Sequence, residues 1–233
     1  MPPARCWPAR RATRPREPDR HLPWIRCAAV VNRGAMKRVL NVGGNSRAIA
    51  LPAPYHDYQV VLLDIDPAGE PDIVCDAREL ATLEPGTFDA VYCSHNLEHY
   101  HEHEVPRVLH GFHHVLRDGG FVHIRVPDIG AVMQAVVQRG LDIEDTLYAS
   151  PAGPIRVLDV VYGYSPEIER SGNPFYAHRT GFTRRSLQRA LVAAGFTSVY
   201  IGSAPMEAVA VAFKGASDPE IEARFGLRGA RPG

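Results

Sequence analysis

Five short apolar runs between residues 36 and 128 constrain the fold of this chain most strongly. They read "KRVLNVGG", "YQVVLLDIDP", "PDIVCDA", "TFDAVYCS" and "GGFVHIRVPD", and each ends in small, polar or acidic residues. The runs are continuously apolar rather than alternating, which is typical of strands that are covered on both faces of a parallel sheet. We therefore predict five strands of one largely parallel sheet.

Two amphipathic helices are predicted beside these strands. Between the fourth and fifth runs, apolar residues recur at three- and four-residue steps and form one stripe: Val105, Val108, Leu109, Phe112, Val115 and Leu116. We expect this helix to end at "RDGG", where Gly119 or Gly120 can adopt the left-handed conformation. A second helix is expected after Thr183, a suitable N-cap residue, and should end at Gly195.

The end of the domain predicts a β-hairpin, because "TSVYIGSAPMEAVAVAF" reads as two strands joined by a Gly-Ser-Ala-Pro turn. Strands that alternate with helices and close on a hairpin predict an α/β fold with a doubly wound, mostly parallel seven-stranded sheet and a C-terminal antiparallel hairpin. Residues 139–182 are rich in glycine and proline and do not follow this pattern. We interpret them as an inserted lid or substrate segment.

The first 35 residues differ in composition from the rest of the chain. They hold eight arginines and six prolines against Glu17 and Asp19, a net charge of +6, and the remainder carries −6. We expect a disordered basic extension over residues 1–35, one domain over 36–215 and a disordered tail over 216–233. Two alternatives for the extension stay open: an arm that contacts nucleic-acid phosphates, or a stretch that precedes a true start at Met36.

The amino-acid composition limits the cellular compartments and the binding partners that we expect for this chain. No run approaches 18 apolar residues, so no membrane span is expected. The four cysteines show no C-x-x-C spacing, which favours a reduced cytoplasmic protein with buried thiols. A nucleic-acid partner is not expected for the domain, and nothing in the sequence specifies an oligomeric state.

Glycines and acids at the strand ends predict a nucleoside site, because ligands of such sheets bind beyond the carboxyl ends of the strands. The first strand ends at Gly43 and Gly44, which allow close approach of a ligand. Asp64 ends the second strand, where a carboxylate can accept both ribose hydroxyls, and Asp76 follows the third, within reach of an adenine amino group. A dinucleotide would need G-x-G-x-x-G, which this loop lacks, whereas the sulfonium cofactor S-adenosylmethionine needs fewer glycines and tolerates acids.

At this point the chain resembles the class I S-adenosylmethionine-dependent methyltransferases, and within them a bacterial group with methyltransferase type 11-like domains that is linked to glycan biosynthesis. The stretches that carry the resemblance are "LNVGGN", "LLDIDP", "PDIVCDAREL", "FDAVYCSHNLEHY", "HHVLRDGGFVHIRVPD" and "AHRTGFTRRSLQRALVAAGF". They span about residues 37–200, and they are specific together rather than singly.

The resemblance implies a set of cofactor-binding residues and S-adenosyl-L-methionine as the cofactor. Those residues are Gly43, Gly44 and Asn45 at the methionine end, Asp64 and Ile65 at the ribose, Asp76 and Ala77 at the adenine, and Ser94 after the fourth strand. The chain departs from many relatives by carrying Asn41 in place of Asp, and Asn45 and Arg47 in place of Gly.

The stretch "SHNLEHYHEHE", residues 94–104, first reads as a zinc motif, because H-x-x-E-H also occurs in one class of zinc hydrolases. A strand that runs up to Ser94 leaves little helix for His95, which argues against that class. A milder alternative is a divalent ion held by His95, Glu98, His99 and His178, although His95 in place of an acid disfavours an oxygen-loving ion. We expect no metal, and we expect Glu98 and His99 to hydrogen-bond to each other and orient the loop.

The predicted function is methyl transfer from S-adenosylmethionine to an acceptor of unspecified identity, a small molecule or a glycan, with a hydroxyl as the reacting group. A hydroxyl needs a base, and histidine suits that role near neutral pH. His178 and His99 are the candidate bases, with Glu98 in support. The alternatives are a cofactor-free methyltransferase-like binding or scaffold protein, and a dinucleotide- or metal-dependent enzyme. Five further histidines are expected to be solvated beside the apolar stripe: His101, His103, His110, His113 and His114. His123 is expected to be a satisfied core histidine.

Overall fold

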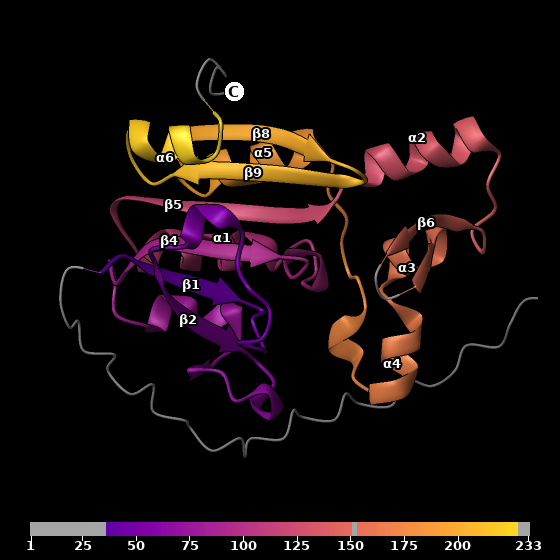
Figure 1. Ribbon diagram of the computed structural model, residues 1–233, viewed down its shortest axis with the longest axis horizontal. Coiled ribbons are helices and arrows are strands. Elements are labelled where there is room, and N and C mark those ends of the chain that lie inside the picture. The colour runs from indigo at the N-terminus through magenta and orange to yellow at the C-terminus, as the bar shows by residue number, and fades with distance from the viewer. Residues whose placement is uncertain (1–35, 151–152, 228–233) are drawn as a thin grey trace, which may run out of the picture.

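The computed structural model describes residues 36–150 and 153–227 (Figure 1). Seven strands form one sheet in the order β3-β2-β1-β4-β5-β9-β8. Their bounds are β1 Arg38–Val42, β2 Gln59–Asp64, β3 Ile73–Val74, β4 Phe88–Ser94, β5 Leu116–Pro127, β8 Ser198–Ala204 and β9 Glu207–Phe213. The first five strands pair in parallel, and β9 is antiparallel to both β5 and β8. The predicted doubly wound sheet with an antiparallel C-terminal hairpin is confirmed.

Helices cover the two faces of this sheet unequally. The α-helices are α1 Val105–Val115, α2 Ile129–Arg139, α3 Val157–Tyr162, α4 Ser165–Ser171, α5 Arg184–Ala193 and α6 Pro219–Arg224. The 3-10 helices are η1 Ala53–Tyr55, η2 Pro67–Gly69, η3 Ala77–Thr82, η4 Leu97–His99 and η5 Pro174–Tyr176. The larger core cluster joins one face of the sheet to α1, α5 and η3. The opposite face packs against η1 and α6 in a cluster rich in tyrosine and phenylalanine.

The segment between β5 and α5 forms a lid with its own small core. It contains α2, the two-stranded sheet of β6 (Thr146–Ser150) and β7 (Gly153–Arg156), α3, α4 and η5. Its buried residues form a cluster separate from the main core: Val132, Ala135, Leu147, Val157 and Val160. In Figure 1 the lid lies beyond the arrowheads of the parallel strands, where such sheets place their ligands.

Several local predictions differ from the structure. The first helix ends at Val115 instead of "RDGG", because Leu116 pairs with Phe88 in the sheet and is buried there as well as it would be on the helical stripe. The predicted Gly-Ser-Ala-Pro turn is wrong as well. Gly202, Ser203 and Ala204 extend β8, and the turn is made by Pro205 and by Met206, whose φ is 59°.

Four α-helices of the structure are absent from the sequence prediction: α3 and α4 lie inside the expected insert, and α2 and α6 lie largely or wholly outside the expected bounds. The lid begins at α2, ten residues before the expected start at 139, and the exposed side of α2 carries Met133 and Val137, so its sequence shows no single apolar stripe. Helix α6 lies in the stretch 216–233 that we expected to be disordered, and its Ile221 is 4% exposed against the sheet. The predictions for residues 1–35 lie outside the described residues.

No helix within residues 36–150 and 153–227 has the length and apolar content that a bilayer crossing requires.

We expect replacement of Thr183 by alanine to lower the free energy of unfolding by about 1 kcal/mol. The Thr183 hydroxyl accepts the Ser186 N–H, and the Ser186 side chain returns to the Thr183 N–H, so this capping box satisfies two backbone donors at the start of α5. Urea unfolding of Thr183→Ala, compared with Thr183→Ser as the variant that keeps the hydroxyl, measures the effect. Equal losses in the two variants would contradict the cap.

Candidate active site

A cavity of about 130 Å³, here named the nucleoside cavity, lies beyond the carboxyl ends of β1, β2 and β4. Loops after these three strands and the 3-10 helix η5 of the lid enclose it. Its lining residues are Gly43, Asn45, Asp64, Ile65, Asp66, His95, Asn96, His99, Asn173, Phe175 and Tyr176. Four of the predicted cofactor residues, Gly43, Asn45, Asp64 and Ile65, therefore lie together.

The glycine loop is shaped by close contacts that no side chain would allow. Gly43 has φ 78°, and a Cβ atom there would lie 2.6 Å from Nδ2 of Asn96. A Cβ atom at Gly44, which is buried, would lie 2.3 Å from Nδ2 of Asn41. Both glycine N–H groups donate to the carbonyl of Leu63, which turns the loop back toward β2. The loop thus fixes the floor of the cavity through its backbone.

Asp64 presents a half-buried carboxylate at the end of β2. Its Oδ1 accepts the N–H of Asp66 at 2.8 Å, and among the described residues no other side chain pairs with it. Burial raises the pKa of Asp64 above its ordinary value, and the neighbouring Asp66 carboxylate adds to this effect. The second oxygen is thus available to hydroxyl donors in the cavity.

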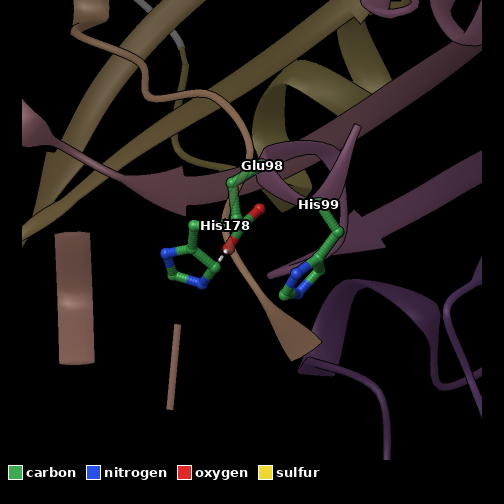
Figure 2. Close-up of side chains that lie close together, drawn as sticks. All are labelled: Glu98, His99 and His178. Carbon is green, nitrogen blue, oxygen red and sulfur yellow. Dashed lines mark ion pairs between the residues drawn. The ribbon is translucent and has the colours of Figure 1, made fainter. Parts of the chain in front are cut away.

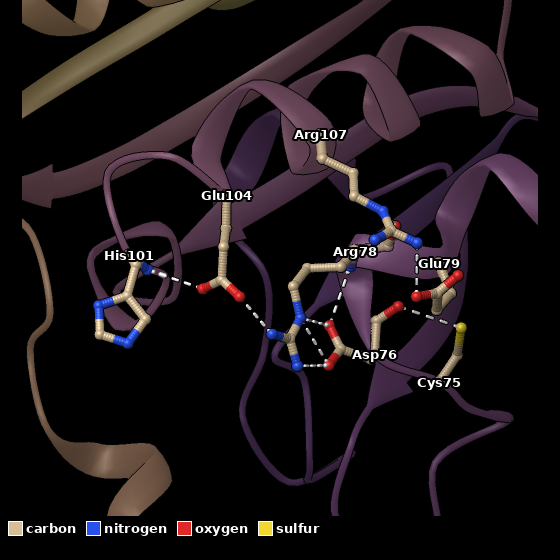
Figure 3. Close-up of polar contacts among 7 residues, drawn as sticks. All are labelled: Cys75, Asp76, Arg78, Glu79, His101, Glu104 and Arg107. Atoms are coloured by element: carbon tan, nitrogen blue, oxygen red, sulfur yellow. Dashed lines mark hydrogen bonds and ion pairs between the residues drawn. The ribbon is translucent and has the colours of Figure 1, made fainter. Parts of the chain in front are cut away.

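Asp76, Ala77 and Ser94 do not line the nucleoside cavity. Figure 3 shows that the Asp76 carboxylate is already hydrogen-bonded to Arg78. The Arg78 guanidinium donates to both carboxylate oxygens, and the backbone N–H of Arg78 donates to Oδ1. Arg78 also pairs with Glu104. Ala77 is 1% exposed, and Ser94 is half-buried at the end of β4. The assignment of Asp76 and Ala77 to an adenine stays a prediction.

A second cavity of about 250 Å³, here named the lid cavity, lies between the lid and the strand ends. It is lined by His95, His99, Pro127, Tyr148, Ile155, Asp159, Val160, Tyr164, Tyr176, His178, Met206 and Glu207. His95, His99 and Tyr176 line both cavities, so the two cavities adjoin at these side chains. These three side chains therefore form the boundary between the two cavities.

Glu98, His99 and His178, the predicted catalytic residues, converge beside this junction (Figure 2). One ligand atom from each lies within 4.8 Å of the others, and the rings of His99 and His178 are 5.0 Å apart between centroids. Glu98 is 1% exposed, and neither of its carboxylate oxygens has a hydrogen-bond partner among the described residues. A buried carboxylate is costly unless positive charge lies nearby.

The surroundings of His178 fix which of its nitrogens faces the site. Its Nδ1 lies 2.8 Å from the carbonyl of Val160 and therefore carries the proton and donates. Its Nε2 then has a lone pair and lies 3.9 Å from Oε1 of Glu98. Burial lowers the pKa of His178 below its ordinary value, although the Glu98 carboxylate opposes this. The neutral, base-competent imidazole is thus favoured near neutral pH.

His95 provides the positive charge beside Glu98. Its Nε2 lies 3.0 Å from Glu207, and its Nδ1 lies 3.5 Å from Glu98. Burial lowers the pKa of His95, but the two carboxylates outweigh burial and bring it to about 9. Its backbone has φ 50°, a left-handed conformation that is uncommon for a side chain other than glycine and is often found at functional sites. Arg125 pairs with the same Glu207, so charges alternate in sign from Arg125 to Glu98.

The expected hydrogen bond between Glu98 and His99 is not formed. Both nitrogens of His99 face carbonyl oxygens instead, Nδ1 that of Ala177 and Nε2 that of His95, each at 3.1 Å. The loop is held to the lid by other bonds, because the carbonyl of Glu98 accepts the N–H groups of Arg179 and Thr180. A neutral His99 can donate one ring N–H to a carbonyl and keep a lone pair on the other nitrogen, so Glu98, His99 and His178 are placed as a metal site would require, and the absence of a metal stays a prediction.

Other histidines also differ from their expected roles. His123 is a core residue as predicted, but its Nδ1 has no hydrogen-bond partner among the described residues, and burial lowers its pKa to about 4. His113 packs edge-on against Phe196, and His114 approaches the carbonyl of Leu83 at 2.9 Å, so these two are not simply solvated.

Sequence reasoning missed several residues of the site. Asn96, Glu207 and the lid tyrosines Tyr148, Tyr164 and Tyr176 line the cavities without having been predicted. A signal existed for Glu207, because an antiparallel strand that pairs with β5 must begin where β5 ends, and Glu207 pairs with Pro127 there. The tyrosines lie in the irregular lid, where no periodicity placed them.

The strand order, the glycine loop and the acid after β2 define a class I methyltransferase fold with its ligand cavity at the carboxyl edge of the sheet. A family model described as a methyltransferase domain matches residues 10–201, and the chain therefore belongs to this methyltransferase family. It is a methyltransferase, and S-adenosylmethionine is the cofactor that the sequence predicts for it.

Solved structures agree with this fold. One is a chain of the complex between the Haloferax volcanii Trm112 methyltransferase activator and its candidate methyltransferase, at TM-score 0.51 and 12% identity over 78% of this chain and 84% of that chain. The PH0226 protein of Pyrococcus horikoshii matches at TM-score 0.50 and 15% identity, covering 77% and 82% of the two chains. A SAM-dependent methyltransferase of Archaeoglobus fulgidus matches at TM-score 0.48 and 18% identity, covering 77% and 86%. No curated protein sequence matches the chain.

The residues of the nucleoside cavity offer polar groups suited to this cofactor, which is larger than the cavity of about 130 Å³, so the cavity must widen when the cofactor binds. The half-buried Asp64 carboxylate is a suitable acceptor for two ribose hydroxyls. Oδ1 of Asn96 is buried without a hydrogen-bond partner among the described residues, and it can accept a hydrogen bond from the ammonium group of the methionine end. The close contact of Gly43 with Asn96 keeps this amide in place.

Replacement of Gly43 by alanine should weaken binding of S-adenosylhomocysteine by at least about tenfold. The added Cβ would displace the Asn96 amide. The alanine would also have to adopt the left-handed φ of Gly43, which costs about 1–2 kcal/mol. Gly140→Ala is the matched control, because Gly140 has φ 62° but open space around the added atom. Isothermal titration calorimetry of both variants measures the difference. Wild-type affinity in Gly43→Ala would show that the glycine serves only the turn.

Proposed function

We propose that the chain transfers the methyl group of S-adenosylmethionine to a hydroxyl of a small molecule or glycan held in the lid cavity. The observation that carries this proposal is the junction of the two cavities at His95, His99 and Tyr176, with the His178 imidazole beside it. The link to glycan chemistry rests on the sequence resemblance alone. The domain is assigned to residues 36–215, and the lid from α2 to η5 selects the acceptor.

When bound, the cofactor supplies the electrophilic methyl group, and the protein mainly positions the acceptor. Asp64, Gly43 and Asn96 hold the nucleoside and methionine ends, with Asn45 and Ile65 at the cavity wall. Alignment of the two reactants can contribute roughly 7–11 kcal/mol to lowering the barrier. The lid also excludes water, because its tyrosines cover the strand ends.

His178 acts as the base in this proposal, and Glu98 assists it. The lone pair on Nε2 accepts the proton of the acceptor hydroxyl, and the imidazolium that forms faces the buried Glu98 carboxylate at 3.9 Å. His99 then has a positioning role, because its ring lies between the carbonyls of His95 and Ala177 and its one N–H donates to one of them, which ties the loop to the lid.

Calorimetry with S-adenosylhomocysteine tests the proposed cofactor site. Binding by the full chain, unchanged by EDTA and absent with NAD, is the expected result. Absence of binding would favour the cofactor-free scaffold protein. Binding of NAD would favour a dinucleotide-dependent enzyme. Loss of binding in the presence of EDTA would support a metal ion at Glu98, His99 and His178.

We expect His95 and His178 to titrate on opposite sides of neutral pH. In NMR titration of ¹³C-labelled histidine, His95 should show a midpoint near its pKa of about 9, and His178 a midpoint below its ordinary value of 6.5. Because the folded-state pKa of His95 exceeds its unfolded value, its protonation stabilises the fold below pH 6.5, and this contribution is lost as the pH rises to about 9.

Glu98→Gln is the variant that checks this assignment. It should move the His95 midpoint downward, since one of the two carboxylates beside the ring is removed. A wild-type His95 midpoint near 6.5, or no change in Glu98→Gln, would refute the charge arrangement.

A further inference from the structure

The lid cavity has the size of a compact ligand. Its volume of about 250 Å³ lies just below the roughly 300–1,000 Å³ of sites for drug-sized molecules, so it accommodates one ring or two fused rings. Much of its wall is apolar or aromatic, from Pro127, Ile155, Val160 and Met206 together with Tyr148, Tyr164 and Tyr176. Such a wall favours a flat, weakly polar molecule over a strongly hydrated one.

Three polar side chains of the wall, Asp159, Glu207 and His99, already have partners within the protein. Both oxygens of Asp159 accept from the Arg156 guanidinium, at 2.9 and 3.0 Å. One oxygen of Glu207 pairs with His95 and the other accepts from Arg125. Both nitrogens of His99 face backbone carbonyls. These groups have little capacity left for a ligand.

This engagement separates two kinds of hydroxyl compound. A sugar carries several hydroxyls, and each one that enters without a partner loses its hydrogen bonds to water, which weakens binding. An aromatic alcohol brings one hydroxyl and a ring that packs against tyrosine. The arrangement therefore disfavours a polyhydroxylated ring and favours an aromatic one.

The proposed base, His178, also favours an aromatic alcohol over a sugar. A phenolic hydroxyl resembles that of tyrosine, with a pKa of about 10, whereas an aliphatic alcohol resembles water, at about 15.7. General base catalysis by an imidazole is more effective for the more acidic hydroxyl. The neutral Nε2 of His178 is therefore better matched to a phenol.

We propose that the lid cavity takes a phenol of one or two rings as methyl acceptor, with its hydroxyl at Nε2 of His178 and its ring among Tyr148, Tyr164 and Tyr176. This inference rests on the proposed function. The phenolic proton passes to Nε2 of His178 as an oxygen–carbon bond forms to the methyl group. The methyl–sulfur bond breaks with its electron pair kept on sulfur, which gives an aryl methyl ether, S-adenosylhomocysteine and an imidazolium.

Ligand-observed NMR on the full chain tests this acceptor class, with and without S-adenosylhomocysteine. The probes are phenol, catechol and 2-naphthol, compared with decahydro-2-naphthol, which has the same carbon skeleton without aromaticity, and with methyl β-D-glucopyranoside. We expect at least one phenol to bind about tenfold more tightly than either comparison compound. Tritium transfer from labelled S-adenosylmethionine to the same phenol is the second readout.

Two variants locate the binding. Ile155→Trp fills the lid cavity and should weaken phenol binding by at least about tenfold while leaving S-adenosylhomocysteine affinity unchanged. Val137→Trp, on the exposed side of α2, is the control and should change neither. Tighter binding of the glucoside, or no binding of any phenol, would overturn the inference. Failure of S-adenosylhomocysteine to bind would instead refute the proposed function, and the phenol affinities measured without it would still be interpretable.

Discussion

Asp64→Ala should reduce the affinity for S-adenosylhomocysteine by about 100-fold or more. Each ribose hydroxyl that donates to a carboxylate is worth about 1.5–3 kcal/mol, and every 1.4 kcal/mol is a factor of ten in the dissociation constant. Asp64 ends β2, lines the nucleoside cavity and has no side-chain partner among the described residues. Calorimetry of wild type and variant measures the loss directly.

Two further variants serve as controls for the Asp64→Ala prediction. Asp64→Asn retains the size of the side chain and the acceptor for the Asp66 N–H, so it separates the loss of charge from a collapse of the loop. Asp118→Asn alters a fully exposed carboxylate at the start of β5, at the opposite end of the sheet, and should leave affinity unchanged. An affinity in Asp64→Ala within about threefold of wild type would place the ribose elsewhere.

His178→Gln should lower the rate of methyl transfer by about 10²–10⁴-fold, the usual contribution of a positioned general base. Its affinity for S-adenosylhomocysteine should stay within about twofold of wild type, because His178 does not line the nucleoside cavity. The rate is measured by tritium transfer to the best acceptor among the phenols and the glycoside above. His110→Gln, an exposed histidine on α1, is the matched control.

The pH profile and a double variant distinguish catalysis from mere packing. If His178 is the base, the wild-type rate rises as the pH passes the lowered pKa of His178, and His178→Gln loses this limb. Glu98→Gln should also slow the reaction, and the double variant should be little slower than His178→Gln, because groups that act as a unit are not additive. Additive losses with an unchanged pH limb would assign His178 to the structure of the lid.

The sheet could be predicted from the sequence because its strands are continuous apolar runs that end in glycine or acid. That pattern located β1, β2 and β4 and, through them, the positions of Gly43 and Asp64. The helix that begins after Thr183 could be predicted for the same reason, since its start depends on hydrogen bonds between neighbouring residues. Local chemistry thus determined most elements that hold the site.

What the sequence could not give depends on contacts between distant residues. Glu98 lies between His95 and His178 only because the lid returns across the end of the sheet, 80 residues later in the chain. Arg78, which holds the Asp76 carboxylate, also pairs with Glu104, 26 residues further along the chain. Helix α6 forms beyond the expected end of the domain because Ile221 packs against the tyrosine- and phenylalanine-rich face of the sheet.

A crystal structure of the full chain with S-adenosylhomocysteine tests the central claim most directly. We predict the ribose hydroxyls on the Asp64 carboxylate, the ammonium group near Oδ1 of Asn96, and the sulfur directed past His95 and His99 into the lid cavity. A nucleoside bound away from Asp64, or a sulfur atom that side chains separate from the lid cavity, would contradict this account.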